Sequence, residues 1–205
     1  MLKLATRYDF QERLRFSNGY LKGGIGRILL ARVPGALQVV KADVQADRHG
    51  TDYWVERGNG KSLAVDVKVR EQDFAPEYDD LALETWSVIG QRVGWTRDSD
   101  KLTDYVLWFW ASTGRFFLAD FPCLCKVFER YWQRWAGTYQ VAKQNSVQGG
   151  RSWQSQCVFV PRLLVMEKMS AWQHGSITLP CNSNPATRTP DFIVDAALFT
   201  QGRIV

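Results

Sequence analysis

Residues 50–70 read GTDYWVERGNGKSLAVDVKVR, and they contain the clearest structural pattern in the sequence. Gly58-Asn59-Gly60 is a strong hairpin signal between two runs that are rich in β-branched and aromatic residues. If these three residues form the loop, counting outward along the two strands places Asp52 directly opposite Asp66. A two-residue turn would shift this pairing by one position, so the register depends on the loop.

Side chains alternate along a strand, so this register gives the hairpin two different faces. One face is apolar and carries Tyr53, Val55, Leu63, Val65, Val67 and Val69. The other face is charged and carries Asp52, Asp66, Lys68 and Arg70. Like charges directly opposite each other destabilise a strand pair. A divalent cation between the carboxylates would compensate, and Mg²⁺ prefers one or two carboxylates together with waters and phosphate oxygens. The alternative is a half-exposed strand with a charged outer face.

The residues Asp52, Asp66 and Lys68 resemble the motif of the PD-(D/E)XK, or restriction-endonuclease-like, nuclease superfamily. That motif has an acid at a strand start, a short hairpin and then (D/E)-x-K on the next strand. Gly50 and the apolar run around Asp66 are similar to Holliday-junction-resolvase-like and phage-encoded members, whereas Thr51 stands where the motif has proline. The resemblance spans about residues 7 to 135 and rests on three or four residues.

The resemblance implies an α/β fold with a mixed central β-sheet flanked by helices. It also implies Mg²⁺-dependent (or Mn²⁺-dependent) hydrolysis of DNA phosphodiester bonds. Asp52, Asp66 and the backbone carbonyl of Val67 would hold the metal. Lys68 points to the same side as Asp66, where it can orient or deprotonate a metal-bound water and stabilise charge on the phosphate.

Two further acids are candidates for the same site. Many members of the resembled superfamily place an auxiliary glutamate on their first helix, and Glu12 is the candidate here. Glu12 fits equally well as the partner of Asp9 in a capping box. Glu84 lies in the alternating run 81–86, which predicts a third strand beside the hairpin. On that strand Glu84 faces either the metal site or solvent.

A net charge of +5 and a pI near 9.1 favour a polyanionic partner. We expect this partner to be DNA, although the sequence does not exclude RNA, and a homodimer is compatible with it. The candidate contacts are Arg70 on the hairpin and Lys126, Arg130 and Arg134 on one side of a helix predicted over residues 122–135. The polar segment 90–101 adds Arg92, Arg97 and Lys101, for which a solvated loop is the alternative.

The length of 205 residues suits a single nuclease-like domain with a C-terminal extension from about residue 137. No apolar run approaches a membrane span and the N-terminus lacks a signal-peptide core, which predicts a cytoplasmic protein. The four cysteines lack zinc-site spacing and are interpreted as reduced thiols. Further strands are predicted over 27–33, 37–44, 104–110, 115–120, 157–166 and 192–199, with a loop over 137–156 that can cover the substrate.

The main alternative function is a catalytically inactive nucleic-acid-binding or protein-interaction module on the same fold, such as a phage accessory or inhibitor protein. The set Asp52, Asp66 and Lys68 argues for a nuclease, because binding alone does not require two adjacent carboxylates.

Overall fold

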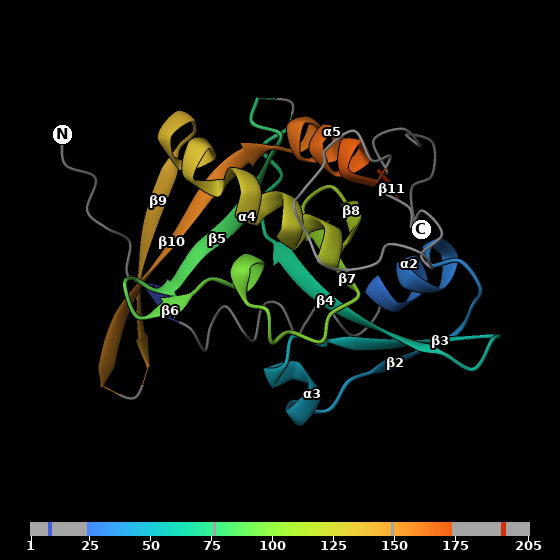
Figure 1. Cartoon of the computed structure of the whole chain (residues 1–205). Helices are drawn as coiled ribbons and strands as arrows, with labels where there is room; N and C mark the ends of the chain where they lie inside the picture. Colours follow the sequence, from blue (N-terminus) through green and yellow to red (C-terminus); the bar gives the residue numbers. More distant parts are fainter. Residues whose placement is uncertain (1–7, 10–23, 76, 149, 174–193, 196–205) are drawn as a thin grey trace.

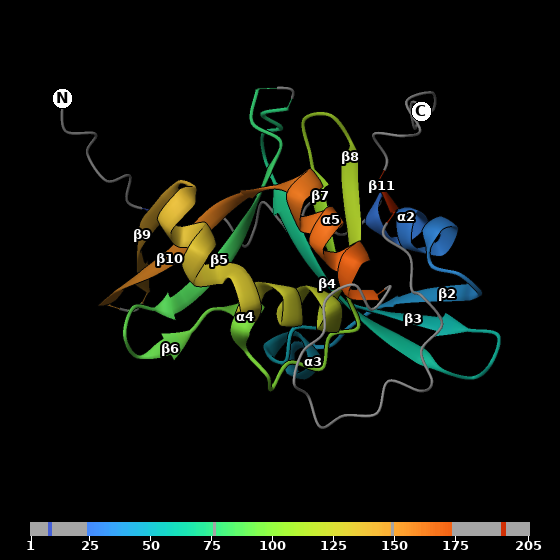
Figure 2. The same ribbon diagram turned by 45° about the horizontal axis from the view of Figure 1, so that its top comes forward.

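The computed structural model describes residues 8–9, 24–75, 77–148, 150–173 and 194–195. Within these residues the chain is a mixed α/β structure with a five-stranded sheet, a six-stranded sheet and four α-helices (Figures 1 and 2). The long helix α4 (Phe121–Thr138) spans the two sheets and contacts strands of both. The predicted fold class, α/β with a mixed sheet, is confirmed at this level.

The six-stranded sheet contains the hairpin. Its strands run in the order β11-β8-β7-β4-β3-β2. The pair β4–β7 is parallel and the other pairs are antiparallel, so the sheet is mixed. The bounds are β2 (Ala36–Lys41), β3 (Tyr53–Arg57), β4 (Ser62–Arg70), β7 (Tyr105–Trp110), β8 (Arg115–Asp120) and β11 (Val194–Asp195).

The hairpin has the register that the three-residue loop predicts. Tyr53 pairs with Val65, and the Arg57 N–H donates to the Lys61 carbonyl at 3.0 Å. Within the loop, Gly60 has φ +75°, a backbone conformation that favours glycine. The turn chemistry of the sequence therefore fixes the pairing of the two strands.

The five-stranded sheet has the order β1-β9-β10-β5-β6. Its bounds are β1 (Tyr8–Asp9), β5 (Asp80–Val88), β6 (Arg92–Val93), β9 (Val141–Gln148) and β10 (Arg151–Pro161). The predicted third strand exists as β5, but its predicted place beside the hairpin is wrong. The long apolar strand β7 occupies that side of β4, and β5 pairs with β10 instead.

The segment from residue 137 onward was predicted as a loop up to residue 156, and this is wrong. It contains β9 and the first half of β10, which pair with each other from Arg151 and Gln148. The strand predicted over 157–166 ends at Pro161, and the chain continues as helix α5 (Arg162–Gln173). This segment is integrated into the structure, because β10 pairs with β5 and the side chains of Val165 and Met169 are buried in the core.

The strand predicted over residues 27–33 is instead helix α2 (Ile25–Arg32). Its buried side chains, Ile25, Ile28 and Leu29, follow helical spacing. The short helix α3 (Val44–Arg48) begins at Asp43, whose side chain accepts a hydrogen bond from the Ala46 N–H at 2.8 Å. The helix predicted over 122–135 is confirmed as α4, and a 3₁₀ turn, η1 (Trp95–Arg97), precedes β7.

No helix in the described part of the chain is long and apolar enough to cross a membrane. The predicted helix that carries Glu12 lies outside the described residues, and of the strand predicted over 192–199 only Val194–Asp195 is described.

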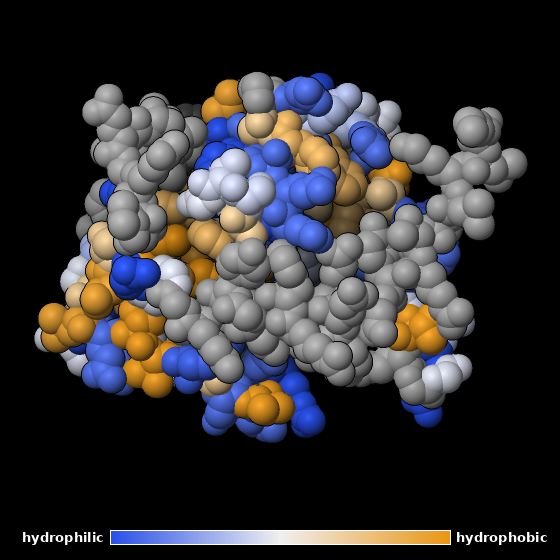
Figure 3. Space-filling model, turned by 180° about the vertical axis from the view of Figure 1, so that it is seen from behind, coloured by the Kyte–Doolittle hydropathy of each residue, from blue (hydrophilic) through white to orange (hydrophobic). Residues whose placement is uncertain are grey.

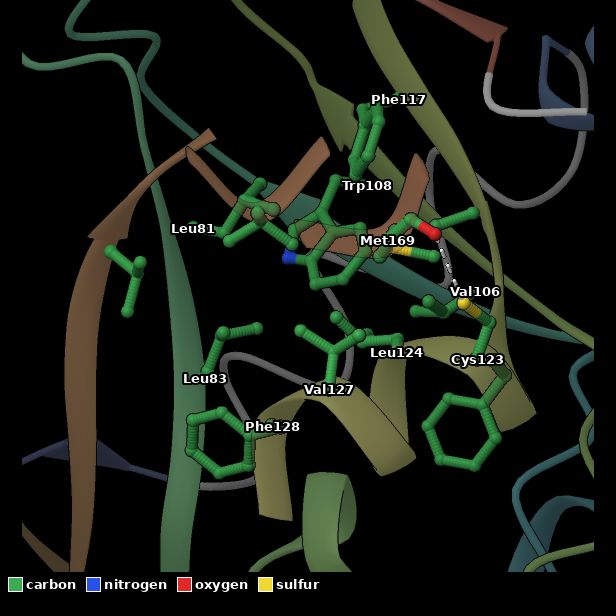
Figure 4. Packing of buried hydrophobic residues seen from close by; sticks show 14 of the residues in the cluster. Leu81, Leu83, Val106, Trp108, Phe117, Cys123, Leu124, Val127, Phe128 and Met169 are labelled. Atoms are coloured by element: carbon green, nitrogen blue, oxygen red, sulfur yellow. Dashed lines mark hydrogen bonds between the residues drawn. The ribbon is translucent and has the colours of Figure 1, made fainter. Parts of the chain in front are cut away.

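Two apolar clusters cover the six-stranded sheet, one on each face. The larger cluster lies between the two sheets and α4, with Trp108, Phe117 and Phe128 among its fully buried side chains (Figure 4). The second cluster lies on the opposite face, where the apolar side of the hairpin packs against Ile25 and Leu29 of α2. Strands β4 and β7 are therefore central, as the apolar run 104–110 predicts.

The connection between β4 and β5 is held by two arginines. The Arg115 guanidinium contacts Asp73 at 2.7 Å and Asp79 at 2.8 Å, and it lies 3.9 Å from the centre of the Trp110 ring. Arg162, at the start of α5, contacts Asp79 at 2.6 Å. These ion pairs fasten the connection to both β8 and α5.

Some apolar side chains remain exposed outside these clusters. Leu37 and Val40 on the edge strand β2, and Val44 on α3, are among them. In the rear view, apolar surface is visible at the lower left, where the β2–β3 end of the sheet lies (Figure 3).

Candidate active site

Asp52 lies directly before β3 and is fixed by two contacts. Its Oδ2 atom accepts a hydrogen bond from the Val67 N–H at 2.7 Å, and its Oδ1 atom accepts one from the Lys41 ammonium at 3.3 Å. Lys41 ends the neighbouring strand β2 and lies 5.0 Å from the centre of the Tyr53 ring. The end of the hairpin thus presents a carboxylate that is only 15% exposed.

The backbone of Val67 faces Asp52 rather than a strand. The Ala64 and Arg70 carbonyls accept hydrogen bonds from residues flanking β7, whereas the Val65 carbonyl accepts from the Asp52 N–H at 2.8 Å. Backbone groups alternate in direction along a strand, so Val67, like Val65, turns toward the β3 side. Since β3 begins at Tyr53, the Val67 carbonyl lies beyond the ladder and on the side of the Asp52 carboxylate.

Asp66 is buried and paired with Lys68. The Lys68 ammonium donates to Asp66 Oδ1 at 2.9 Å and lies 2.8 Å from Oδ2. Although Oδ2 is within ion-pair distance of lysine, it accepts no well-aligned hydrogen bond from a described residue. This oxygen therefore depends on the ion pair with Lys68 rather than on an aligned hydrogen bond.

The two carboxylates interact electrostatically. Burial, and then the negative charge of Asp66, raise the pKa of Asp52 above its ordinary value, against the opposing effects of the Val67 N–H and the nearby lysines. Burial alone would lower the pKa of Lys68, but the charge and hydrogen bond of Asp66, together with Asp52 and Glu84, outweigh it and raise that pKa. Lys68 therefore stays an ammonium beside its carboxylate.

A second lysine approaches Asp66 from the segment between η1 and β7. The Lys101 ammonium lies 3.9 Å from Asp66 Oδ2, and the lysine side chain is 16% exposed. The segment is anchored by Thr103, whose hydroxyl donates to the Gly50 carbonyl at 2.7 Å. Gly50 has φ +86°, and a Cβ there would lie 2.5 Å from the Lys101 ammonium. Glycine is required here for both its conformation and its lack of a side chain.

Glu84 reaches the site from the other sheet but has a supporting role. Its Oε2 atom accepts hydrogen bonds from the Ser87 hydroxyl at 2.7 Å and from the Trp95 N–H at 3.0 Å. The centre of the Trp95 ring lies 4.9 Å from the Lys68 ammonium, so the indole and the ammonium form a cation–π contact. Glu84 is thus close to Lys68, and its carboxylate holds the tryptophan in place.

The predicted nucleic-acid contacts separate into two groups. Arg70 is partly buried, and burial lowers its pKa while Cys157, Glu84 and Asp80 act in the opposite direction, so its guanidinium faces residues of the other sheet. The three predicted residues of α4, Lys126, Arg130 and Arg134, are exposed along one side of the helix. Arg97 is tied to Glu129 and stacks 4.3 Å from the centre of the Trp132 ring.

The sequence reasoning missed Lys41 and Trp95 as parts of this site, and it named Lys101 as a candidate phosphate contact without placing it beside Asp66. Lys41 belongs to a strand that pairs with β3, and Trp95 and Lys101 lie in the connection before β7. Lys41 contacts Asp52, Trp95 lies against Lys68 and Lys101 approaches Asp66. These contacts depend on tertiary packing, which leaves no local pattern in the sequence.

The donor set is compatible with a hard divalent cation. Asp52, Asp66 and the Val67 carbonyl would supply the oxygen ligands, and Mg²⁺ is commonly held by one or two carboxylates and waters. The Oδ2 atom of Asp66, which accepts no aligned hydrogen bond from a described residue, is consistent with such a ligand role. Within the described residues, no group of three or more His, Cys, Asp or Glu side chains is arranged to hold a metal ion.

The three described cysteines, Cys123, Cys125 and Cys157, are free, and burial raises the pKa of each thiol to about 12. They are therefore protonated and poorly suited to nucleophilic or metal chemistry.

Comparison with family models, with curated proteins and with solved structures gives no match to this chain.

Proposed function

We propose that this chain is a metal-dependent nuclease of the restriction-endonuclease-like type that hydrolyses DNA phosphodiester bonds. The observation that carries the proposal is the pair of buried, interacting carboxylates Asp52 and Asp66, with the Lys68 ammonium in contact with one of them. A purely structural strand end has no need for two adjacent carboxylates whose charges repel each other.

Asp52, Asp66 and the Val67 carbonyl would hold Mg²⁺ or Mn²⁺. When bound, such an ion supplies Lewis acidity toward the phosphate and lowers the pKa of a bound water. The Lys68 ammonium would orient the attacking water and stabilise negative charge on the phosphate oxygens. Glu84 would keep Trp95 against Lys68, and the low exposure of both carboxylates would exclude bulk water from the reacting groups.

DNA is the proposed partner because the protein carries a net charge of +5. The exposed residues Lys126, Arg130 and Arg134 of α4 would contact phosphates away from the reacting centre, and Arg70 would support the interior of the site. RNA remains an alternative substrate, and a homodimer is compatible with the proposal.

The alternative function is a nucleic-acid-binding or protein-interaction module without catalysis. One observation favours it: Lys68 already contacts both oxygens of Asp66, so this carboxylate has a compensating charge without a metal ion. The two functions predict different results in a cleavage assay, whereas both allow binding.

The test is cleavage of labelled single-stranded, duplex and branched DNA and of RNA, with and without Mg²⁺. We expect Mg²⁺-dependent cleavage by the wild type, and Asp66→Asn and Lys68→Ala should each abolish it. Matched controls are Glu56→Gln and Lys143→Ala, which change exposed residues of the strands β3 and β9 and should leave cleavage unchanged. Wild-type cleavage by a folded Lys68→Ala variant would remove Lys68 from the mechanism, and inactivity of the wild type on every substrate would favour the alternative.

A further inference from the structure

The Lys101 side chain is largely enclosed, and its ammonium is only loosely paired among the described residues. Its side chain is 16% exposed, and its acidic contact, Asp66 Oδ2, lies 3.9 Å away, too far for a hydrogen bond. No hydrogen bond to this ammonium is present among the described residues. An ammonium carries three donors. Those of Lys101 are therefore available to a ligand that can accept hydrogen bonds.

The chain holds Lys101 in this position by specific contacts. The Thr103 hydroxyl donates to the Gly50 carbonyl at 2.7 Å, and the Leu102 N–H donates to the His49 carbonyl at 3.4 Å. Gly50, at φ +86°, leaves the space that the ammonium occupies. A positive-φ glycine and an anchored connection together bring a second cation over Asp66.

The two lysines beside Asp66 indicate the sign of a ligand that could bind between them. Lys68 already lies 2.8 and 2.9 Å from the two carboxylate oxygens, so one lysine is enough to compensate Asp66. Lys101 adds a further positive charge close to Lys68, and the two ammonium groups repel each other in a partly buried place. An oxyanion that accepts from both lysines would relieve this repulsion and satisfy the free donors.

We propose that Lys101 and Lys68 together bind a phosphate oxygen of the nucleic-acid backbone, so that Lys101 is a substrate-binding residue. The choice of a phosphodiester rests on the proposed nuclease function, whereas the need for an oxyanion rests only on the two lysines. The structure thereby assigns the scissile phosphate to the space between the β4 strand and the connection that carries Lys101.

The first experiment measures binding of labelled duplex DNA from about 50 to 200 mM salt, with Ca²⁺ in place of Mg²⁺ to suppress cleavage. Lys101→Met keeps the apolar stem and removes the charge. We expect the affinity of this variant for DNA to fall about tenfold. The slope of log affinity against log salt concentration should become shallower by about 0.9, the value for one phosphate contact. Lys101→Arg should keep both, and the control Lys143→Met should bind like the wild type. Wild-type affinity and slope in Lys101→Met would overturn the proposal.

The second experiment uses inorganic phosphate alone and does not require a nuclease. In phosphate-free buffer Lys101→Met should melt at a higher temperature than the wild type, because it removes a partly buried charge that shares the Asp66 Oδ2 atom with Lys68. Phosphate should stabilise the wild type more than this variant, and an equal response would overturn the oxyanion site. A third outcome separates the two proposals. If the wild type neither cleaves nor binds any nucleic acid, but phosphate stabilises it more than Lys101→Met, the nuclease function is wrong. The oxyanion site is then retained, with another phosphate compound as its ligand.

Discussion

The Asp52 carboxylate accepts a hydrogen bond from the Val67 N–H at 2.7 Å, at the place where the next rung of the β3–β4 ladder would otherwise lie. A side chain thus replaces a backbone partner, and the strand β4 continues without β3. The same contact holds the carboxylate beside the Val67 carbonyl and near Asp66. The geometry of the candidate site is therefore set by the way in which the hairpin ends.

Asp52→Asn should stabilise the protein at neutral pH in the absence of divalent cations. Asparagine can still accept from the Val67 N–H, and it removes a buried charge next to Asp66. The pKa of Asp52 is raised in the folded state from its ordinary value of 3.8, so the folded state binds this proton more tightly. The destabilisation by Asp52 therefore grows as pH rises through the folded pKa and is complete above it.

We expect a higher melting temperature for Asp52→Asn at pH 7 and a smaller difference near pH 4. For a chain of this size, a gain of about 1 kcal/mol corresponds to roughly 2–4 °C. The measurement is thermal unfolding across this pH range, with Glu56→Gln as the exposed control. A lower melting temperature at pH 7 would contradict the prediction.

Mg²⁺ or Mn²⁺ should raise the melting temperature of the wild type but not of the Asp52→Ala/Asp66→Ala double variant. A ligand that binds only the folded state at about 100 times its Kd stabilises it by about 2.7 kcal/mol. Calorimetry should give a metal affinity that is lost in the double variant and retained in Glu56→Gln. Equal affinity in the wild type and the double variant would exclude this metal site.

Gly50→Ala should destabilise the protein more than Gly114→Ala. Both glycines have positive φ, +86° and +71°, so either alanine costs about 1–2 kcal/mol for its conformation. An added Cβ at Gly114 meets nothing within 4 Å, whereas at Gly50 it lies 2.5 Å from the Lys101 ammonium and 2.9 Å from the Thr103 hydroxyl. Urea unfolding of the two variants measures the difference, and only Gly50→Ala should weaken phosphate binding. Equal effects on stability and binding would show that the space around Lys101 is not required.

Arg162→Met should lower the free energy of unfolding by about 1–3 kcal/mol, because it removes charged hydrogen bonds to Asp79, which keeps its ion pair with Arg115. Arg162 is 4% exposed and contacts Asp79 at 2.6 Å. The matched control is Lys168→Met on the same helix, whose ion pair with Glu167 is exposed and should contribute about 0–1 kcal/mol. Denaturant unfolding compares the two, and equal effects would contradict the structural role of Arg162.

The same ion pair has a pH signature. Burial opposes ionisation of Asp79, but hydrogen bonds and charge from Arg162 and Arg115 outweigh it and lower the pKa of Asp79. The stability that this carboxylate contributes is complete above its ordinary pKa, 3.8, and is lost as pH falls through the folded value. The loss of stability on acidification that comes from Asp79 should therefore be smaller in Arg162→Met than in the wild type.

The elements that were predicted well are those with a strong local pattern. The loop Gly58-Asn59-Gly60 predicted the hairpin register, the apolar run 104–110 predicted the central strand, and helical spacing predicted α4. In each of these elements the spacing of apolar residues in the sequence matches the spacing of buried side chains in the structure. A single periodicity therefore describes the whole element.

The errors have identifiable causes. In α2 the adjacent residues Ile28, Leu29 and Leu30 resemble a short strand, and the helical spacing is visible only when Ile25 is included. Strands β9 and β10 are rich in Gln and Ser, so they lack the apolar alternation by which strands are recognised. The location of β5 and the approach of Lys101 depend on pairing between distant segments, which spacing along one sequence does not encode.

Asp52, Asp66 and Lys68 all belong to one hairpin whose opposite face is packed into the second apolar cluster. Their relative positions are consequently established when the protein folds. Ligand binding therefore does not carry the free-energy cost of bringing these side chains together. Lys101 belongs to a connection between η1 and β7, joined to the hairpin by only a few hydrogen bonds. Amide hydrogen exchange should therefore be slowest in the hairpin and faster around Lys101. Substitutions in that connection can change ligand preference during evolution while the carboxylate geometry stays the same.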